Sequence, residues 1–305
     1  MTRAIAAQLV LSLRRQRTFL ALLVTLLVMT ALAGVIGWIS HRTIIKVYDQ
    51  AVTLLATTGT PAPPNPFDTK PTLALLSNMV IYIPLIGALM ALVLGHLSMA
   101  DDQSSGIGRL IFSRQVTRRS YVTGKMLGAL TVLTVIMAAS LLVSVASLLI
   151  VNGTVLSASD FGRLVLFYVI SLLYLTAFAL IGMVTVLLTR RRSMGLLLAL
   201  GVWLVLTFAI PQFTSGLRPT ASLNPITDPV STSQTFFDVT AKARPLSVSE
   251  QYKEASTRVL EIGSPESALA TSWRVLPIGC LVLVMAALTA LLVSRHDYSR
   301  SSVNE

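Results

Sequence analysis

The chain has 305 residues, of which 54% are hydrophobic and 12% are charged. Soluble domains carry roughly twice that share of charged residues, so the composition excludes an ordinary soluble domain and indicates a membrane protein. The net charge of +11 comes from Lys and Arg gathered beside apolar runs, which argues against a nucleic-acid-binding protein. A single cysteine, Cys280, excludes a disulfide framework and a thiolate metal cluster.

The N-terminal segment predicts a short helix at the membrane surface. Ile5, Leu9 and Leu13 recur at every fourth position and arginines follow, so residues 3–17 are expected to form an amphipathic interfacial helix. A simple charge signal that orients the first span explains the same residues equally well. The apolar run that comes next is too long for a cleaved signal peptide, and we interpret it as an uncleaved first span.

Six apolar stretches are long enough to cross a hydrocarbon core, which needs about 20 helical residues. We therefore predict an all-α polytopic membrane protein in which residues 1–305 form one transmembrane domain. The predicted spans are residues 19–39, 73–99, 126–151, 164–188, 194–213 and 275–293. They contain no acidic or basic residue, which disfavours the intramembrane carboxylates of ion-coupled transporters. His96, near the end of the second stretch, is interpreted as an interfacial histidine beside a polar neighbour rather than as a gate or ligand.

Alternate connections differ in charge, and Lys and Arg prefer the cytoplasmic side. One side carries fourteen cations and four acids, a net charge of +10, which leaves ten cations and nine acids, or +1, on the other side. The cations of the first side are Arg3, Arg14, Arg15, Arg17, Arg109, Arg114, Arg118, Arg119, Lys125, Arg190, Arg191, Arg192, Arg295 and Arg300. This side is predicted to be cytoplasmic, with both termini on it.

Two connections fall on the other side. Five prolines make residues 57–72 an extended linker. The longer segment, residues 214–273, contains Ser247 and Glu250 at the spacing of a capping box. Tyr252, Ala255, Val259 and Ile262 follow at helical spacing, and Gly263 and Pro265 provide a stop. We expect a small helical extracytoplasmic cap that packs over the spans.

The connection between the second and third spans predicts a short amphipathic helix over residues 101–112. Asp101 or Asp102 is suited to capping its N-terminus. Ile107, Leu110 and Ile111 then share one face. Gly106 and Gly108 lower its intrinsic stability by roughly 1 kcal/mol each, so the helix is expected to pack against a partner protein.

This connection resembles that of ABC-2 type permeases. Its acidic start at Asp101, Gly106, the apolar run of residues 110–112, Arg114, and Gly124-Lys125 at the next span are similar to the family's pattern in kind and order. Gln115 stands where the family often has proline. Leu223-Asn224-Pro225 is similar to the branch that includes copper-maturation and sodium- or antibiotic-efflux permeases.

The resemblance implies that this chain is the permease subunit of an ABC exporter in the cytoplasmic membrane. It implies two ATPase subunits, a second copy or a homologous permease, and membrane lipid as partners, with ATP and Mg bound by the ATPases and no cofactor in this chain. The resemblance further implies that the helix of residues 101–112 is the coupling helix, which binds in a groove on the ATPase. The implied ATPase-coupling residues are Asp101, Asp102, Gly106, Ile107, Arg109, Leu110, Ile111, Arg114, Arg118 and Arg119. Of these, Arg114, Arg118 and Arg119 flank the helix, and for each arginine a purely topological charge is an equally good explanation. Gly124 and Gly128 are implied to permit close packing of the third span, and the substrate-binding residues are unknown.

Two other functions remain as alternatives. A membrane scaffold that anchors or regulates partners without moving anything fits the same spans. An intramembrane enzyme is disfavoured, because the sequence has neither a His-Glu-x-x-His motif nor a nucleophile elbow. Gly124-Lys125 lacks the rest of a phosphate-binding loop, so any ATP is expected to be hydrolysed by a partner.

Overall fold

A computed structural model describes residues 2–13, 15–58, 72–104, 117–152, 156–189, 191–214, 239, 242–262 and 269–295. Six helical stretches are long and apolar enough to span a membrane: Arg17–Thr57, Leu73–Asp101, Arg118–Ile150, Ala158–Leu188, Arg192–Thr214 and Val275–Ser294. The described residues contain no strand. The predicted all-α polytopic fold is therefore confirmed.

The first helix, α1 (Thr2–Leu13), lies against α6 (Arg118–Asn152). Ile5, Leu9 and Leu13, which predict an interfacial helix, are all buried, and the first two contact the α6 positions Gly124 and Gly128. A Cβ at Gly124 would lie 2.9 Å from the Cβ of Ile5, and a Cβ at Gly128 would lie 2.9 Å from Leu9 Cδ2. The apolar stripe of α1 is thus covered by protein.

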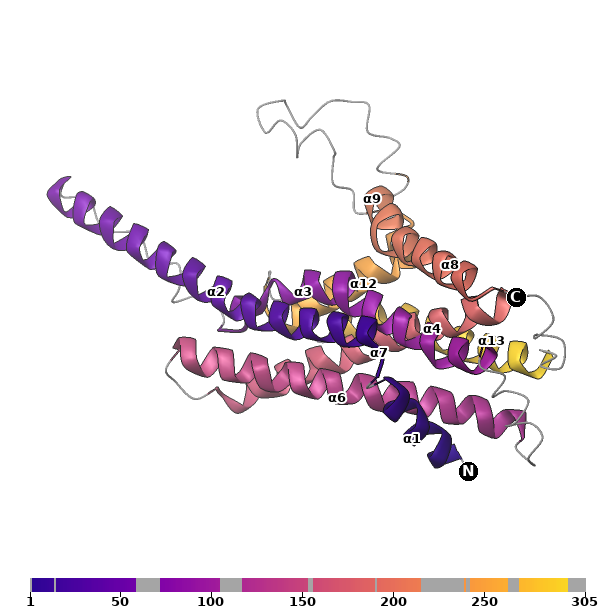
Figure 1. Ribbon diagram of the computed structural model, residues 1–305. Coiled ribbons are helices and arrows are strands. Elements are labelled where there is room, and N and C mark those ends of the chain that lie inside the picture. The colour runs from indigo at the N-terminus through magenta and orange to yellow at the C-terminus, as the bar shows by residue number, and fades with distance from the viewer. Residues whose placement is uncertain are drawn as a thin grey trace.

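The second helix, α2 (Arg17–Thr58), is twice as long as the predicted span of residues 19–39. Its 42 residues correspond to about 63 Å, and Figure 1 shows it projecting beyond the other helices. No glycine or proline occurs between residue 39 and Gly59, so nothing in the sequence ends the helix at the edge of the hydrocarbon. The Arg42 guanidinium lies 4.4 Å from the centre of the Trp38 ring, which makes a cation–π pair. Such residues are typical of the membrane–water interface, where α2 leaves the hydrocarbon core.

The second span is built from shorter pieces. They are the 3₁₀ turn η1 (Thr72–Leu76), α3 (Met79–Tyr82), the π-helical turn η2 (Ile83–Gly87) and α4 (Ala88–Ser104). Pro84 lies in η2 and cannot donate a backbone hydrogen bond to the preceding turn, which explains the local change of helix type. The Trp203 indole donates to the carbonyl of Pro84 at 3.4 Å.

The helix α7 (Ala158–Leu188) lies in the centre of the bundle and contacts α4, α6, α8, α12 and α13. It crosses α4 in backbone contact, because Gly95 faces the carbonyl of Ala179 and Gly182 faces the carbonyl of Leu92. Neither position has room for a side chain. A polar pair adds to the packing between α7 and α6, where the Tyr168 hydroxyl is bonded to Ser144 at 2.7 Å.

The fifth span, like the second, combines a π-helical turn with a nearby proline. It comprises α8 (Arg192–Leu204), the π-helical turn η3 (Val205–Ala209) and α9 (Ile210–Thr214). Pro211 follows η3 and leaves the preceding turn without one N–H donor. The hydroxyl of Ser249, from a later helix, donates to the carbonyl of Leu206 in this turn at 2.9 Å.

That later helix is α12 (Val248–Val259), preceded by the 3₁₀ turn η4 (Arg244–Leu246). The predicted N-cap is confirmed, because Ser247 Oγ accepts from the Glu250 N–H at 3.4 Å. The reciprocal half of the capping box is not formed, since the Ser247 N–H donates to the carbonyl of Arg244 at 3.0 Å. The helix ends at Val259, before the predicted stop at Gly263 and Pro265, which lies outside the described residues. Glu261 has a φ of 54°, in the left-handed region that glycine usually occupies after the end of a helix.

The helix α12 reaches deeper than a cap over the ends of the spans. Tyr252 stacks on Tyr174 with ring centroids 4.5 Å apart and bonds to Ser171 at 2.9 Å. Tyr174 lies 14 residues before the end of α7, which places it about 21 Å along the helix and near its middle. Hydroxyl groups on α7 pair with those of α12, and the acidic side chains of α12 pair with Arg244 and Lys253. These partners explain how a polar helix can lie inside an apolar bundle.

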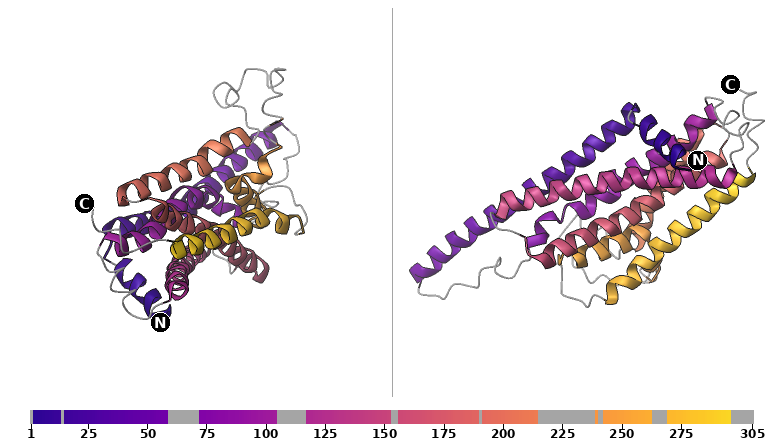
Figure 2. Two further views of the ribbon diagram at one scale, coloured as in Figure 1. Left: turned by 90° about the vertical axis from the view of Figure 1, so that its right-hand side faces the viewer. Right: turned by 90° about the horizontal axis from the view of Figure 1, so that it is seen from below.

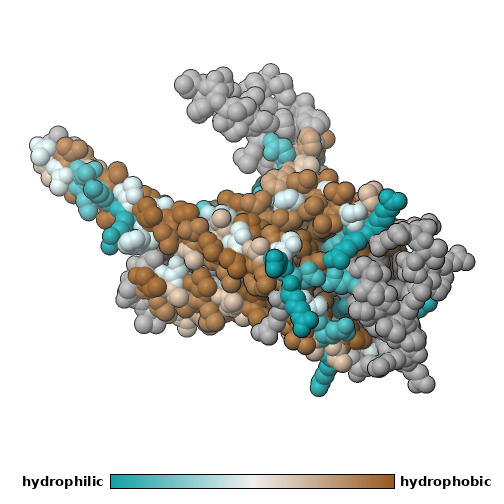
Figure 3. All heavy atoms as spheres, viewed as in Figure 1, coloured by the Kyte–Doolittle hydropathy of each residue, from teal (hydrophilic) through white to brown (hydrophobic). Residues whose placement is uncertain are grey.

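The last helix, α13 (Leu269–Arg295), runs beside α7 and α12, as the view from below in Figure 2 shows. Only 11% of its apolar window is buried, against 67% for α7. Hydrophobic side chains cover the middle of the face in Figure 3, and hydrophilic ones gather at the right-hand end and along the outer part of α2. This is the pattern of a bundle embedded in lipid.

Candidate coupling site

Asp101 joins three segments at the arginine-rich end of the bundle. Its Oδ1 atom lies 2.9 Å from Arg192 Nη2, at the start of α8. Its Oδ2 atom accepts a hydrogen bond of 3.0 Å from Gln16, in the turn between α1 and α2. The carboxylate is 30% exposed, so water screens the ion pair only in part. The end of α4 is therefore fastened to two other elements at this residue.

The predicted start of the coupling helix at Asp101 is wrong. Residues 101–104 continue α4, so Asp101 and Asp102 lie in its last turn instead of capping a new helix. The reason is local, because no glycine or proline separates Met99 from Gly106 and the helix simply continues. The rest of the predicted coupling helix, with Gly106, Ile107, Arg109, Leu110, Ile111 and the following Arg114, lies outside the described residues.

The other end of this connection is fastened to the last helix. The Arg118 guanidinium, at the start of α6, donates to the carbonyl of Ser294 in the last turn of α13. A cation at this place complements the partial negative charge of a helix C-terminus. The Ser120 N–H donates to Thr117 Oγ1 at 3.3 Å, which caps α6, and Arg119 is exposed.

Gly124 and Gly128, the glycines predicted to permit close packing, lie about one and two turns after Ser120 in α6. Gly124 and Gly128 face α1, so the close packing is between α6 and the N-terminal helix. Lys125 is buried between them, with its ammonium group 5.7 Å from the centre of the Tyr121 ring. The Thr2 and Ser120 hydroxyls are 3.0 Å apart and join the same two helices.

Gln16 and Arg192 belong to this site, although sequence reasoning assigned neither of them to it. Arg192 entered the prediction only as a topological charge, and no pattern links residues 85 positions apart, as Gln16 and Asp101 are. His96, which sequence reasoning interprets as an interfacial residue, is buried in the wall beside this site. It is 3% exposed, and among the described residues its Nδ1 atom has no hydrogen-bond partner.

The described residues of the site make contacts between helix ends and form no metal-binding cluster. Within the described ranges, no group of three or more His, Cys, Asp or Glu side chains is placed to hold a metal ion. What the described residues provide is a set of polar ties between helix ends. A force applied to the segment between Ser104 and Thr117 would act on α4 and α8 at one end, and on α6 and α13 at the other.

Residues 3–298 match the family model described as ABC-2 family transporter protein. The chain thus belongs to the ABC-2 transporter family and is a permease component of an ABC transporter. Permeases of this family are generally non-catalytic membrane subunits that associate with ABC ATPases. None of the curated proteins compared with the chain matches it.

Proposed function

We propose that this chain is the permease of an ABC exporter in the plasma membrane, with both termini in the cytoplasm. Two ATPase subunits bind and hydrolyse ATP with Mg, and a second permease, identical or homologous, completes the path. The orientation follows from the net charge of +10 on the side that holds the candidate coupling site. The branch with copper-maturation and sodium- or antibiotic-efflux permeases remains the proposed relationship within the family.

One observation carries the coupling role: both ends of the connection are tied to other helices. Asp101 links the end of α4 to Gln16 and Arg192, and Arg118 links the start of α6 to the end of α13. A partner that displaces the connection would therefore move four helices together rather than one loop. We propose that the ATPase seats on residues 105–116 and that these ties carry its motion into the bundle.

The test uses the full chain purified with its ATPase. We expect Asp101→Asn and Arg118→Gln to leave the complex assembled but to lower permease-dependent ATP turnover about tenfold, within the usual range of coupling between sites. Gly106→Arg should weaken assembly itself, because it changes the segment on which the ATPase would seat. Arg163→Gln is the matched control, since Arg163 pairs with Glu261 near the start of α7, at the end of the bundle away from the candidate coupling site.

The scaffold alternative predicts a different result. A membrane anchor needs no mechanical link, so all four variants would keep normal ATP turnover while the ATPase remained bound. Unchanged turnover in Asp101→Asn and Arg118→Gln, together with normal assembly in Gly106→Arg, would reject the coupling role.

A further inference from the structure

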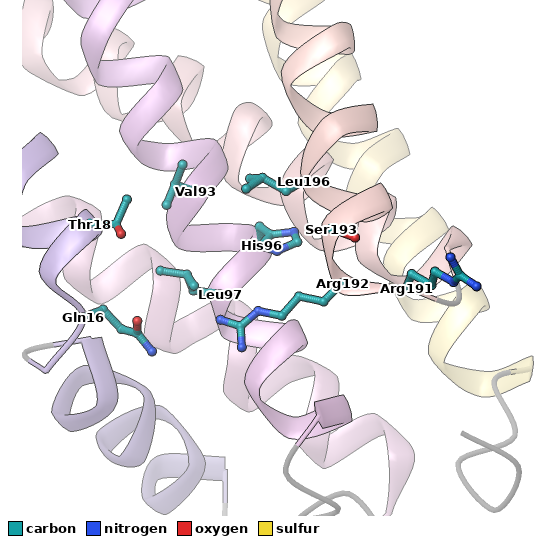
Figure 4. A pocket seen from close by; sticks show the side chains of 9 residues that line it. All are labelled: Gln16, Thr18, Val93, His96, Leu97, Arg191, Arg192, Ser193 and Leu196. Atoms are coloured by element: carbon teal, nitrogen blue, oxygen red, sulfur yellow. The ribbon is translucent and has the colours of Figure 1, made fainter. Parts of the chain in front are cut away.

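A hollow of about 780 Å³ opens beside the candidate coupling site, between the α1–α2 turn, α4 and the start of α8. Figure 4 shows the side chains that line it. They are Gln16, Thr18, Val93, His96, Leu97, Arg191, Arg192, Ser193 and Leu196. Two arginines and four other polar side chains thus share a cavity with three aliphatic ones.

The polar and apolar parts of this lining lie at different depths. Arg191 and Arg192 are at the membrane-surface end of α8, at the level of Asp101. Val93 lies eight residues before Asp101 on α4, about 12 Å further into the bundle. The hollow is therefore cationic at the surface and aliphatic inside, which matches the two parts of an anionic amphiphile.

The start of α8 favours a bound anion, and the first turn of α8 contains no acidic residue that could take this place. Arg191 is the N-cap and Arg192 the first residue of the helix, and its first turn has no acidic residue and no side-chain cap. Backbone N–H groups and the helix dipole favour negative charge at this end, so two cations there are unfavourable without a bound anion. Asp101 offsets one of them by its 2.9 Å contact with Arg192.

A buried polar atom on the wall of the hollow points to a ligand independently. The ring of His96 is turned toward the first turn of α8 in Figure 4. The side chain is 97% buried, yet the described residues offer its Nδ1 atom no hydrogen-bond partner. Buried polar groups are nearly always paired, so this atom, which none of the described residues satisfies, is suited to bind a ligand in the hollow.

We propose that this hollow binds an anionic phospholipid of the leaflet on the arginine-rich side. Its phosphate lies against Arg191, Ser193 and the N-terminus of α8. A phosphate or ester oxygen pairs with the Nδ1 atom of His96, and an acyl chain lies along Val93, Leu97 and Leu196. Basic pockets between transmembrane helices are a known mode of headgroup binding. This site does not depend on the proposed transport function, because a lipid held here could also fix the junction of α4 and α8 in a scaffold.

The experiment places the full chain in nanodiscs of phosphatidylcholine with or without phosphatidylglycerol and measures retained lipid by native mass spectrometry. The wild type should retain phosphatidylglycerol in preference to phosphatidylcholine. Arg191→Gln should lose about fivefold of that preference, the effect of one cation near a lipid surface. Arg3→Gln, on the same side but outside the hollow, is the matched control and should behave as the wild type.

A second variant separates lipid binding from charge. Leu196→Trp fills the aliphatic part and should abolish retention of either lipid at this site while the thermal unfolding of the protein stays cooperative. Equal lipid preference in the wild type and Arg191→Gln would overturn the proposal. So would stabilisation by glycerol phosphate alone that matches stabilisation by the lipid, which would identify a soluble anion, or loss of bound lipid when the ATPase assembles, which would identify a protein-docking site.

Discussion

Glu261 occupies a backbone conformation that usually belongs to glycine. The Ile262 N–H donates to the carbonyl of Thr257 at 2.8 Å and the Glu261 N–H donates to Arg258 at 3.0 Å, which is the Schellman arrangement at the end of α12. In that arrangement the φ of Glu261 is 54°, where a Cβ is unfavourable by about 1–2 kcal/mol. Its carboxylate pairs with Arg163, and both side chains are about two-fifths exposed, so the pair offsets little of this.

Two substitutions of Glu261 separate the backbone effect from the ion pair. Both Glu261→Gly and Glu261→Ala remove the carboxylate, but only the glycine removes the Cβ. We expect Glu261→Gly to be more stable than Glu261→Ala by about 1 kcal/mol, measured by thermal unfolding in detergent. Equal stability of the two variants would show that the left-handed position is not strained.

At the scale of elements, the crossing of α4 and α7 depends on two glycines that touch the opposite backbone. A Cβ at Gly182 would also lie 2.9 Å from the backbone nitrogen of His96, and backbone cannot yield as a flexible side chain can. Gly201, in α8, has no atom within 4 Å of the same position. The two sites therefore test the same change with and without a neighbour.

We expect Gly182→Ala to destabilise the protein by about 1–3 kcal/mol, because it forces two packed helices apart. Gly201→Ala should instead be neutral or stabilising by up to about 1 kcal/mol, since alanine favours a helix. Unfolding in increasing concentrations of denaturing detergent measures both. A loss in Gly201→Ala equal to that in Gly182→Ala would contradict the model of the crossing.

The docking of α12 depends on one hydroxyl that serves two helices. Ser249 is bonded to the Tyr174 hydroxyl at 3.0 Å and to the Leu206 carbonyl at 2.9 Å. Ser249→Ala should cost about 1–3 kcal/mol, because buried polar groups on α7 and η3 lose this partner. Thr257→Ala, which removes only a bond to the carbonyl of Glu254 within α12, should have a smaller effect. Comparable losses in both variants would argue against the docking role, and protease protection of α12 would report it directly.

For the whole molecule, the extension of α2 allows a test of orientation. About 19 residues of α2 follow the predicted span, or about 28 Å of helix, and Thr53 is exposed near its end. In a Cys280→Ser background, Thr53→Cys should react with a membrane-impermeant maleimide in intact cells. Gln8→Cys, exposed on α1, should react only after lysis. The reverse pattern would place the arginine-rich side outside and reject the proposed topology.

The sequence was sufficient for the spans because a bilayer demands long apolar helices whatever their neighbours are. The same reasoning predicted the cap at Ser247, a contact three residues apart. Prediction from sequence failed where the position of a residue or helix depends on partners that are remote in the sequence. An acidic residue suits a helix N-terminus, so the sequence predicts a capping role for Asp101. Its actual partners, Gln16 and Arg192, are remote in sequence and leave no local pattern. The depth of α12 depends on hydroxyls of α7, which nothing in the sequence of α12 reveals.

The polar character of α12 also determines the order in which parts of the protein assemble. Four of its twelve residues are charged: Glu250, Lys253, Glu254 and Arg258. Such a segment cannot enter a bilayer by partitioning, as the apolar spans do. It can take its place only after α7 offers the hydroxyls of Ser171 and Tyr174. Insertion of the spans and burial of α12 are therefore separate stages of biogenesis, and the second completes a bundle that the first has already placed in the membrane.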